Sequence, residues 1–361
     1  MILIIADDLS GAAELAGIAF THGLSAEVQT EFQPRTEAQV VCLDTDTRRM
    51  SIEEATAALH ALAKRIQTAR PDFIYKKTDS ALRGHISAEL GVLLEATARV
   101  RAFFVPANPS RGRVIRDGDY LIEDKPLHKT DFAQDPQYPV STANVAERLG
   151  CDPAIVIPEV TKSTDLEDAA AACDDLVLPA GAGDFFAALL EARGYPARPV
   201  EFTSADAPAL FVCGSLTAWG RGRASQCNSS GVPVCAMPAE LLGQSQHAAA
   251  MHEWVQATCA TLAEHGAAML TIGRVKAVNH AALLESRLAL AMTMVLAQME
   301  VSRLLLEGGA TARSALNRLQ WKQLQTEALA ATDLPALRVA EKAPRVFIKP
   351  GSYDWPDSVW P

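Results

Sequence analysis

A single turn of this chain carries an unusual density of polar groups: three cations, two hydroxyls and one carboxylate. These residues are Lys76, Lys77, Thr78, Asp79, Ser80 and Arg83. Cationic and hydroxyl groups bind anions and sugar oxygens, and cations around a carboxylate keep it ionised. A solvated loop is the plain alternative. The density of polar groups favours a cradle for an acidic, oxygen-rich small molecule.

The elements on either side of this turn predict where it lies. The apolar run 73–75 before it predicts a short buried strand, and Ile86, Leu90 and Leu93 after it recur at helical spacing. A strand, a polar turn and a helix in this order place the turn at the carboxyl edge of a parallel α/β sheet, where ligands usually bind. Backbone N–H groups at the start of the helix would add to anion binding.

Three further polar turns follow predicted strands in the first half of the chain, at 6–11, 44–49 and 106–113. In a parallel sheet all of these turns lie at one edge, so we expect them to converge. Asp7 and Asp8 would accept a proton or hold a sugar hydroxyl. Arg48 would bind a carboxylate or phosphate bidentately.

The second half of the chain places glycine-bearing turns after predicted strands, at 214–217, 307–312 and 349–352. Glycine lets the backbone approach a phosphate closely. Neither the G-x-x-x-x-G-K-[ST] loop nor the G-x-G-x-x-G dinucleotide fingerprint is present. Together the three turns predict a nucleotide domain.

Strands and helices alternate in both halves, on either side of a segment rich in Pro and small residues. We expect an α/β fold with two domains, 1–193 and 210–361, joined by the linker 194–209. Each domain would be a mainly parallel sheet flanked by helices, and the two would face each other across a cleft.

Composition excludes several classes of protein. The net charge of −10 argues against a general nucleic-acid or anionic-membrane surface, and no apolar run approaches the roughly 20 residues of a membrane span. Seven scattered cysteines without C-x-x-C favour thiols in a reducing cytoplasm over a zinc site, and no export signal is visible. We expect a cytoplasmic protein with a small-molecule partner. The sequence leaves its oligomeric state, including a homo-oligomer, open.

Seven motifs occur in order along the chain. They are IADDLSGAAELAG at 5–17, DTDTR at 44–48, YKKTDSALRGHISAEL at 75–90, PANPSRGR with DGDYLIEDKPLHKTDFAQDP at 106–136, CGSLTAWGRGRASQ at 213–226, LLEGGATARSAL at 305–316 and FIKPGS at 347–352. With these motifs the chain resembles the four-carbon acid sugar kinase family, whose members phosphorylate 3-oxo-tetronates, D-threonate or D-erythronate with ATP.

The resemblance implies an ATP-dependent kinase with an N-terminal acid-sugar domain, a C-terminal nucleotide domain, and ATP and Mg2+ as cofactors. It implies substrate contacts at Asp8, Arg48 and the turn from Lys77 to Ser80, to which we add Asp7 and Arg83 from their places in the same turns. The metal ligands stay unassigned. The ATP contacts that it implies are Ser215, Gly308, Gly309, Ala310, Thr311 and Gly351.

A kinase of this kind needs a carboxylate that orients the attacking hydroxyl and accepts its proton. Asp79 lies in sequence beside Lys76, Lys77 and Arg83, whose charges would make it a poor base. Asp7 and Asp8 are adjacent in the chain, and we expect one of these carboxylates to face the substrate and the other to cap the following helix or bind magnesium. Asp8 is the predicted base. Ser10 is the predicted N-cap of a helix over 12–21.

Two alternatives remain open at this point. GAGDFF at 181–186 resembles the anion-hole turn of ribokinase-type sugar kinases and would make Asp184 the base, but Leu178-Pro179 replaces the customary Asp-Thr upstream. A tight strand-to-helix turn is the simpler interpretation of this motif. The second alternative is a catalytically degenerate sugar-acid binding protein. The turns GGAT and KPGSYD depart from the family pattern, which often has an acidic residue before the Thr and a second glycine after KPG.

Overall fold

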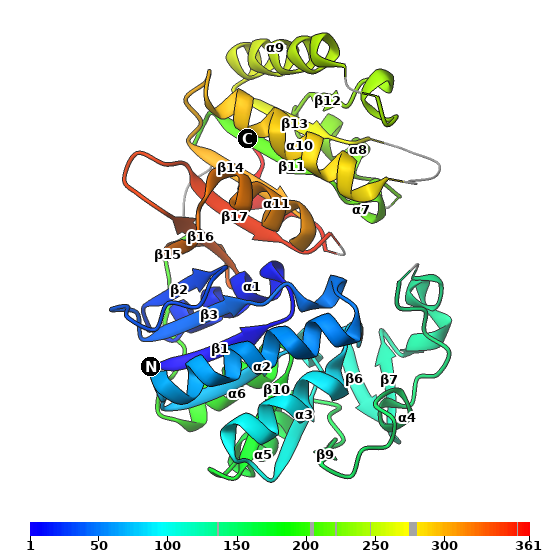
Figure 1. Ribbon diagram of the computed structural model, residues 1–361, viewed down its shortest axis with the longest axis vertical. Coiled ribbons are helices and arrows are strands. Elements are labelled where there is room, and N and C mark those ends of the chain that lie inside the picture. The colour runs from blue at the N-terminus through cyan, green and yellow to red at the C-terminus, as the bar shows by residue number, and fades with distance from the viewer. Residues whose placement is uncertain (136, 203–205, 221, 246, 274–279, 352) are drawn as a thin grey trace. The chain divides into compact units, whose positions relative to one another are not determined.

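The computed structural model describes residues 1–361 apart from 136, 203–205, 221, 246, 274–279 and 352 (Figure 1). The chain divides into two compact units, Met1–Pro199 and Val200–Pro361. The division falls inside the segment 194–209, which the sequence predicts as a linker. Residues 203–205 of that segment and Ser352 of the last glycine turn lie outside the described residues. The arrangement of the two domains across a cleft stays a prediction.

The first unit contains a parallel sheet with the strand order β2-β3-β1-β4-β10-β5-β9. Its central strands are buried along their whole length, because helices cover both faces of the sheet, and this explains their continuous apolar runs. The strands are β1 (Ile2–Ala6), β2 (Ala26–Gln29), β3 (Val40–Asp44), β4 (Phe73–Lys77), β5 (Arg101–Val105), β9 (Ile155–Val156) and β10 (Val177–Gly181).

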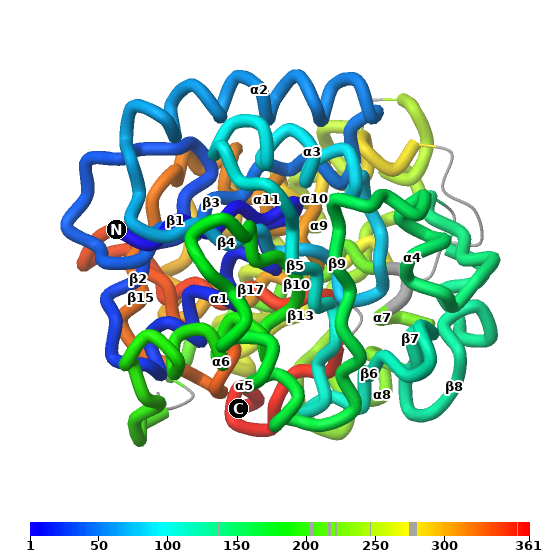
Figure 2. The backbone as a smooth tube through the Cα atoms, turned by 90° about the horizontal axis from the view of Figure 1, so that it is seen from below, coloured from blue at the N-terminus to red at the C-terminus, as the bar shows by residue number. Residues whose placement is uncertain are grey.

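The helices of the first unit form a layer on each side of this sheet. Figure 2 shows α2 (Ile52–Ala69) and α3 (Ile86–Thr97) on one side, and α1 (Leu9–Thr21), α5 (Ser163–Ala171) and α6 (Gly183–Ala192) on the other. The sequence therefore predicted this unit correctly as a parallel sheet flanked by helices.

An antiparallel insertion lies between β5 and β9. It contains β6 (Arg113–Arg116), β7 (Asp119–Ile122), β8 (Lys125–Pro126) and the short helix α4 (Val145–Arg148). Asp117 and Gly118 join β6 to β7 with positive φ values of 52° and 77°, as a two-residue hairpin turn requires.

The second unit is also α/β. Its parallel strands are β12 (Val234–Ala236), β13 (Ala267–Thr271), β11 (Ala209–Cys213), β14 (Arg303–Glu307) and β17 (Arg345–Lys349), in this order across the sheet. The sheet continues with two antiparallel strands, β16 (Leu334–Arg338) and β15 (Gln323–Ala331), which the sequence analysis did not predict.

Helices α9 (Ala248–His265), α10 (Ala281–Leu296) and α11 (Gly309–Leu319) pack in succession against one another (Figure 1). The helices α7 (Leu216–Gly220) and α8 (Arg223–Ser229) follow β11. Phe211, Phe347 and Trp355 belong to a buried core cluster of this unit. Among the described residues, no helix is long and apolar enough to cross a membrane.

Candidate active site

The turns after β1, β3 and β4 meet at the carboxyl edge of the first unit, because these three strands are neighbours. Arg48 donates two hydrogen bonds to Asp7, from Nε to Oδ2 at 2.8 Å and from Nη2 to Oδ1 at 2.7 Å. Its Nη1 donates to Asp8 Oδ2 at 2.9 Å and lies 3.5 Å from Asp79 Oδ1. Asp7 therefore occupies the bidentate face of Arg48, which we expected to bind a substrate carboxylate.

A second bidentate pair joins Asp79 to Arg83, with Nε 2.7 Å from Oδ2 and Nη2 2.9 Å from Oδ1. Burial raises the pKa of Asp79, but the charges of Arg83, Arg48 and Lys77 and the hydrogen bond from Arg83 outweigh it. The pKa is held well below its ordinary value. A carboxylate with so low a proton affinity is a poor general base.

The two lysines at the end of β4 point to different helices. Lys76 Nζ lies 2.5 Å from Glu89 Oε2 on α3, and both side chains are almost fully buried. Lys77 Nζ lies 3.1 Å from Glu14 Oε2 on α1. The sequence placed Lys76 among the cations around Asp79, but the structure directs it to Glu89, because successive strand side chains point to opposite faces of the sheet. Burial lowers the pKa of Lys77, but the charges of Glu14, Asp8 and Asp7 outweigh burial and raise it above its ordinary value.

Asp8 is the N-cap of α1, so the expectation that Ser10 caps this helix is wrong. The carboxylate predicted to face the substrate is therefore also the one that caps the helix, and the expected division of these two roles between Asp7 and Asp8 is wrong. Asp8 Oδ1 accepts the N–H of Gly11 at 2.8 Å, while its Oδ2 accepts the Ser10 hydroxyl at 2.7 Å. The helix starts at Leu9, so Ser10 already lies in its first turn. The Asp8 side chain is 15% exposed and that of Asp7 is 4% exposed, so Asp8 is the more accessible carboxylate.

Thr78 and Ser80 are positioned differently within the same turn. Thr78 is buried, and in the described part of the chain its hydroxyl has no hydrogen-bond partner. The Ser80 carbonyl accepts hydrogen bonds from Arg113 Nη1 at 2.8 Å and from the Tyr120 hydroxyl at 2.7 Å. The insertion therefore fixes the turn. The sequence analysis missed Arg113 and Tyr120, although both lie in motifs that carry the resemblance.

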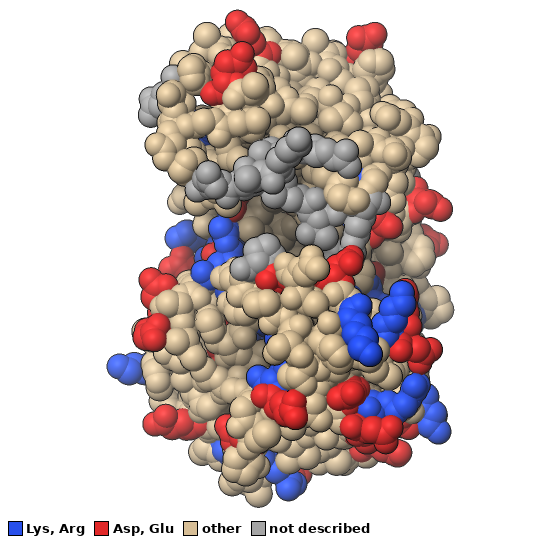
Figure 3. Space-filling model, turned by 90° about the vertical axis from the view of Figure 1, so that its right-hand side faces the viewer, with Lys and Arg blue, Asp and Glu red and all other residues tan. Residues whose placement is uncertain are grey.

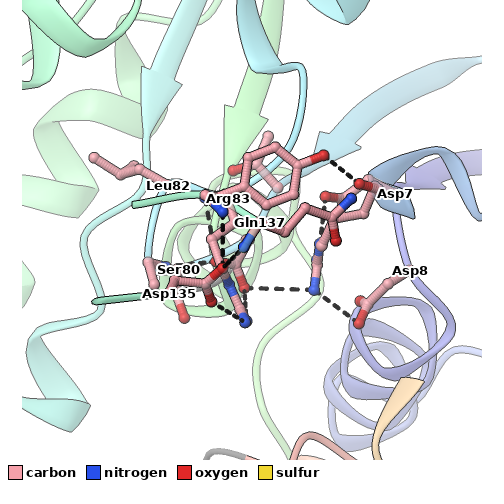
Figure 4. A network of polar contacts seen from close by, with 12 residues as sticks. Asp7, Asp8, Ser80, Leu82, Arg83, Asp135 and Gln137 are labelled. Carbon is pink, nitrogen blue, oxygen red and sulfur yellow. Dashed lines mark hydrogen bonds and ion pairs between the residues drawn. The ribbon is translucent and has the colours of Figure 1, made fainter. Parts of the chain in front are cut away.

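A second part of the insertion, residues 131–135 with 137 and 138, also contacts the network. Asp135 Oδ2 lies 3.5 Å from Arg83 Nη1, and the Tyr138 hydroxyl donates a hydrogen bond to the Arg48 carbonyl. Figure 4 places Asp135 beside Arg83 and Ser80, while Asp7 and Asp8 lie toward α1. These contacts were not predicted, because they join residues far apart in the sequence.

Asp184 has a structural role at the start of α6. Its two carboxylate oxygens accept hydrogen bonds from the Ser110 N–H at 2.9 Å and the Ser110 hydroxyl at 2.8 Å. Its own N–H donates to Asn108 Oδ1 at 2.9 Å. These bonds tie the turn after β5 to the helix, as expected of a tight strand-to-helix turn.

The glycine turns of the second unit meet at the carboxyl ends of β11, β14 and β17. A Cβ atom on Gly214 would overlap Thr311 Oγ1, and one on Gly351 would overlap the Ser215 hydroxyl. Gly308 has a φ of +98°, which favours glycine. The structure thus brings the predicted ATP-binding residues Ser215, Gly308, Gly309, Ala310, Thr311 and Gly351 together at one edge.

A buried ion triad lies at the ends of the strands that carry these turns. Glu307 Oε1 accepts hydrogen bonds from Arg223 Nη2 at 2.6 Å and from Lys349 Nζ at 2.8 Å. Lys349 Nζ also donates to the Pro350 carbonyl at 2.8 Å. The triad therefore joins the residue before Gly308 to the start of the last turn. The sequence analysis missed all three residues, since none is near another in the chain.

Two features of the described residues concern a metal site and a polyanion-binding surface. No group of three or more His, Cys, Asp or Glu side chains in this part of the chain is arranged to hold a metal ion. Figure 3 shows acidic and basic side chains interspersed over one face, and the coloured residues there form no continuous basic surface of the kind that binds a polyanion.

A family model and several curated proteins are similar to this chain. Residues 2–181 match the family model of a sugar-binding N-terminal domain. The D-threonate kinase of Salmonella typhimurium is 32% identical over 161 residues, which cover 44% of this chain and 38% of that kinase. The D-erythronate kinase of Heliobacterium modesticaldum is 28% identical over 181 residues, which cover 48% of this chain and 41% of that kinase. The chain thus spans less than half the length of these curated relatives.

The solved structure of a Haemophilus influenzae protein of the DUF1537 family is similar over nearly the whole chain. Its TM-score is 0.69, and the match covers 98% of this chain and 97% of that one. The sequences are 18% identical, so this similarity concerns the fold.

Proposed function

Because the chain belongs to the four-carbon acid sugar kinase family, we propose that it transfers a phosphoryl group from ATP to a hydroxyl of a four-carbon sugar acid. The substrate would be a tetronate or a 3-oxo-tetronate. The observation that carries the proposal is the network of Asp7, Asp8, Arg48, Asp79 and Arg83, which lies at the carboxyl edge of the sheet within the matched sugar-binding region.

The first unit would bind the acid through the turn from Lys77 to Arg83. The hydroxyl of Thr78 is buried in this turn without a hydrogen-bond partner among the described residues, and a buried polar group without a partner is costly. A substrate hydroxyl or carboxylate would satisfy it. Asp8 and Arg48 would complete the contacts from the two neighbouring turns.

Asp8 would be the carboxylate that accepts the proton from the attacking hydroxyl. It is more exposed than Asp7 and accepts one hydrogen bond from Arg48, whereas Asp7 accepts two. Burial raises the pKa of Asp7, but Arg48 outweighs it, so that the pKa of Asp7 is lowered. Neither Asp7 nor Asp79 would therefore take a proton readily.

The second unit would bind ATP through its glycine turns. The first backbone N–H groups of α11 have no carbonyl of the same helix to donate to, and Gly308, Gly309 and Gly351 allow the backbone to approach phosphate oxygens closely. Mg2+ would be bound mainly by the nucleotide phosphates and water, as is usual for this ion. It would supply positive charge at the transferred phosphoryl group.

An assay of ADP release tests this proposal. The wild-type chain is mixed with ATP, magnesium and one of D-erythronate, D-threonate or their 3-oxo forms. We expect saturable ADP release with at least one acid and none without acid. Heat on calorimetric titration of an acid without any ADP release would instead identify a sugar-acid binding protein.

A further inference from the structure

The cations of the acid-sugar site differ in how firmly their nitrogens are held. All three nitrogens of the Arg48 guanidinium donate hydrogen bonds of 2.7–2.9 Å to Asp7 and Asp8. Arg83 donates two such bonds to Asp79 from Nε and Nη2. Among the described residues, Arg83 Nη1 has only the ion pair with Asp135, at 3.5 Å, which exceeds the normal hydrogen-bond length. Of the guanidinium nitrogens of Arg48 and Arg83, Arg83 Nη1 is therefore the one best able to donate a hydrogen bond to the carboxylate of a ligand.

Backbone N–H groups of the residues that follow Asp135 orient its carboxylate toward Arg83 Nη1. Its Oδ1 accepts the N–H groups of Gln137 at 3.0 Å and Tyr138 at 2.8 Å. Its Oδ2 remains for Arg83, and Figure 4 shows the two side chains directed toward each other. The side chains of Arg83 and Asp135 are 24% and 17% exposed, so solvent and small solutes reach this pair.

The segment around Asp135 is attached to the site at more than one point. The Tyr138 hydroxyl binds the Arg48 carbonyl, and the Tyr138 ring packs edge-on against His85 with centroids 5.9 Å apart. The Phe132 ring centroid lies 5.7 Å from Arg83 Cζ. These contacts therefore hold the segment that carries Asp135 against the site.

The network already carries an excess of negative side-chain charge, which disfavours the binding of another anion. Its carboxylates, Asp7, Asp8, Glu14, Asp79 and Asp135, outnumber its cations, Arg48, Lys77 and Arg83. A sugar acid that entered with Asp135 still on Arg83 would add one more negative charge to this excess. If the sugar acid takes the place of Asp135 Oδ2 at Arg83 Nη1, the cation keeps a carboxylate partner, and the partly exposed Asp135 oxygen turns to water, where its charge is screened.

We propose that the Asp135 carboxylate competes with the carboxylate of the sugar acid for Arg83 Nη1, and so sets the affinity of the site for acids. The inference rests on the proposed function, because it assumes a carboxylate ligand at this site. It assigns to the insertion a role in recognising the charge of the substrate, in addition to fixing the turn after β4.

The test replaces Asp135 by Asn, which removes the charge but keeps Oδ1 as acceptor for the two backbone N–H groups. Dissociation constants of D-threonate, D-erythronate and the neutral tetritol erythritol are measured by calorimetry. We expect Asp135→Asn to tighten binding of an acid that the wild type binds by about three- to tenfold, as for a partly exposed ion pair, and to leave erythritol unchanged. Asp135→Ser, which can also accept those N–H groups, should act in the same direction if the first variant folds poorly.

Asp124→Asn is the matched control. It removes the same charge from the insertion, but Asp124 is 81% exposed and pairs with Arg116 at 3.3 Å. Acid affinity should not change in this variant. Weaker or unchanged acid binding by Asp135→Asn, or an equal gain in Asp124→Asn, overturns the inference while the proposed function stands. Failure of the wild type and the variants to bind any acid overturns the proposed function and the inference with it.

Discussion

The two units hold charged clusters that differ in exposure and in what they offer a ligand. The network around Arg48 in the first unit lies at the sheet edge and includes partly exposed side chains. The triad of Arg223, Glu307 and Lys349 in the second unit is buried, and the turns beside it offer backbone and small residues. The first site would therefore recognise its ligand by side chains, whereas the second would contact its ligand by backbone groups that buried charges hold in place.

The largest effect is expected from Glu307→Ala, because it leaves Arg223 and Lys349 buried without their carboxylate. We expect a loss of about 3–5 kcal/mol in the unfolding free energy of the second unit. All five tryptophans lie after residue 200, so their fluorescence during denaturation reports on this unit. Glu327→Ala removes a 39%-exposed partner of Arg338 and should cost less than about 1 kcal/mol. Equal losses in both variants would contradict the structural role of the triad.

A large effect on turnover is expected from Asp8→Asn. Asn remains a good N-cap for α1 but cannot accept the proton. The kcat should fall at least ~10²-fold, while ATP affinity stays near that of the wild type. Asp184→Asn is the comparison variant and should keep most of its turnover. Full turnover of Asp8→Asn together with an inactive Asp184→Asn would favour the ribokinase-like alternative.

Arg48→Ala should weaken the binding of the sugar acid much more than the binding of ATP. Its loss leaves Asp7 and Asp8 without their cation, and their charges would repel a sugar acid. We expect acid binding to weaken by roughly 1.5–3 kcal/mol, the range for a hydrogen bond to a charged group, with little change for ATP. Calorimetric titration with each ligand measures both affinities, and the exposed neighbour Arg49→Ala serves as control. A similar loss for both ligands, or for neither, would remove Arg48 from the acid-sugar site.

Gly351→Ala should have the opposite selectivity. The added Cβ would overlap the Ser215 hydroxyl and push the last turn away from the others. We expect ATP binding to weaken by about 1–3 kcal/mol, the usual effect of overpacking, and acid binding to stay unchanged. Gly243→Ala, whose Cβ would meet no atom within 4 Å, is the matched control. Unchanged ATP affinity in Gly351→Ala would argue against this turn as a nucleotide contact.

The smallest effect is a pH dependence of stability in the first unit. The pKa of Asp79 is well below its ordinary value, so its contribution to stability is present above the unfolded pKa of about 3.9. It is lost as the pH falls from about 4 toward the folded pKa. The difference in Tm between the wild type and Asp79→Asn should therefore shrink between pH 6 and pH 3. A difference that is constant over this range would show that Asp79 is not stabilised by Arg83 and Arg48.

The sequence by itself determined the elements and the edge at which the polar turns lie. Apolar runs predicted β1, β3 and β4, and helical spacing predicted α3. These features depend on residues near one another in the chain, whose spacing fixes local structure. The low proton affinity of Asp79 could also be predicted, since Arg83 lies four residues further along the same polar turn.

Tertiary structure alone decided which charges pair. Lys76 and Lys77 are adjacent in the sequence but bind Glu89 and Glu14, because the strand directs them to helices on opposite faces of the sheet. The contact of Asp135 with Arg83 and the triad around Glu307 likewise join segments that only the fold brings together. Such pairs leave no periodic signal in the sequence, since their geometry depends on how distant elements pack.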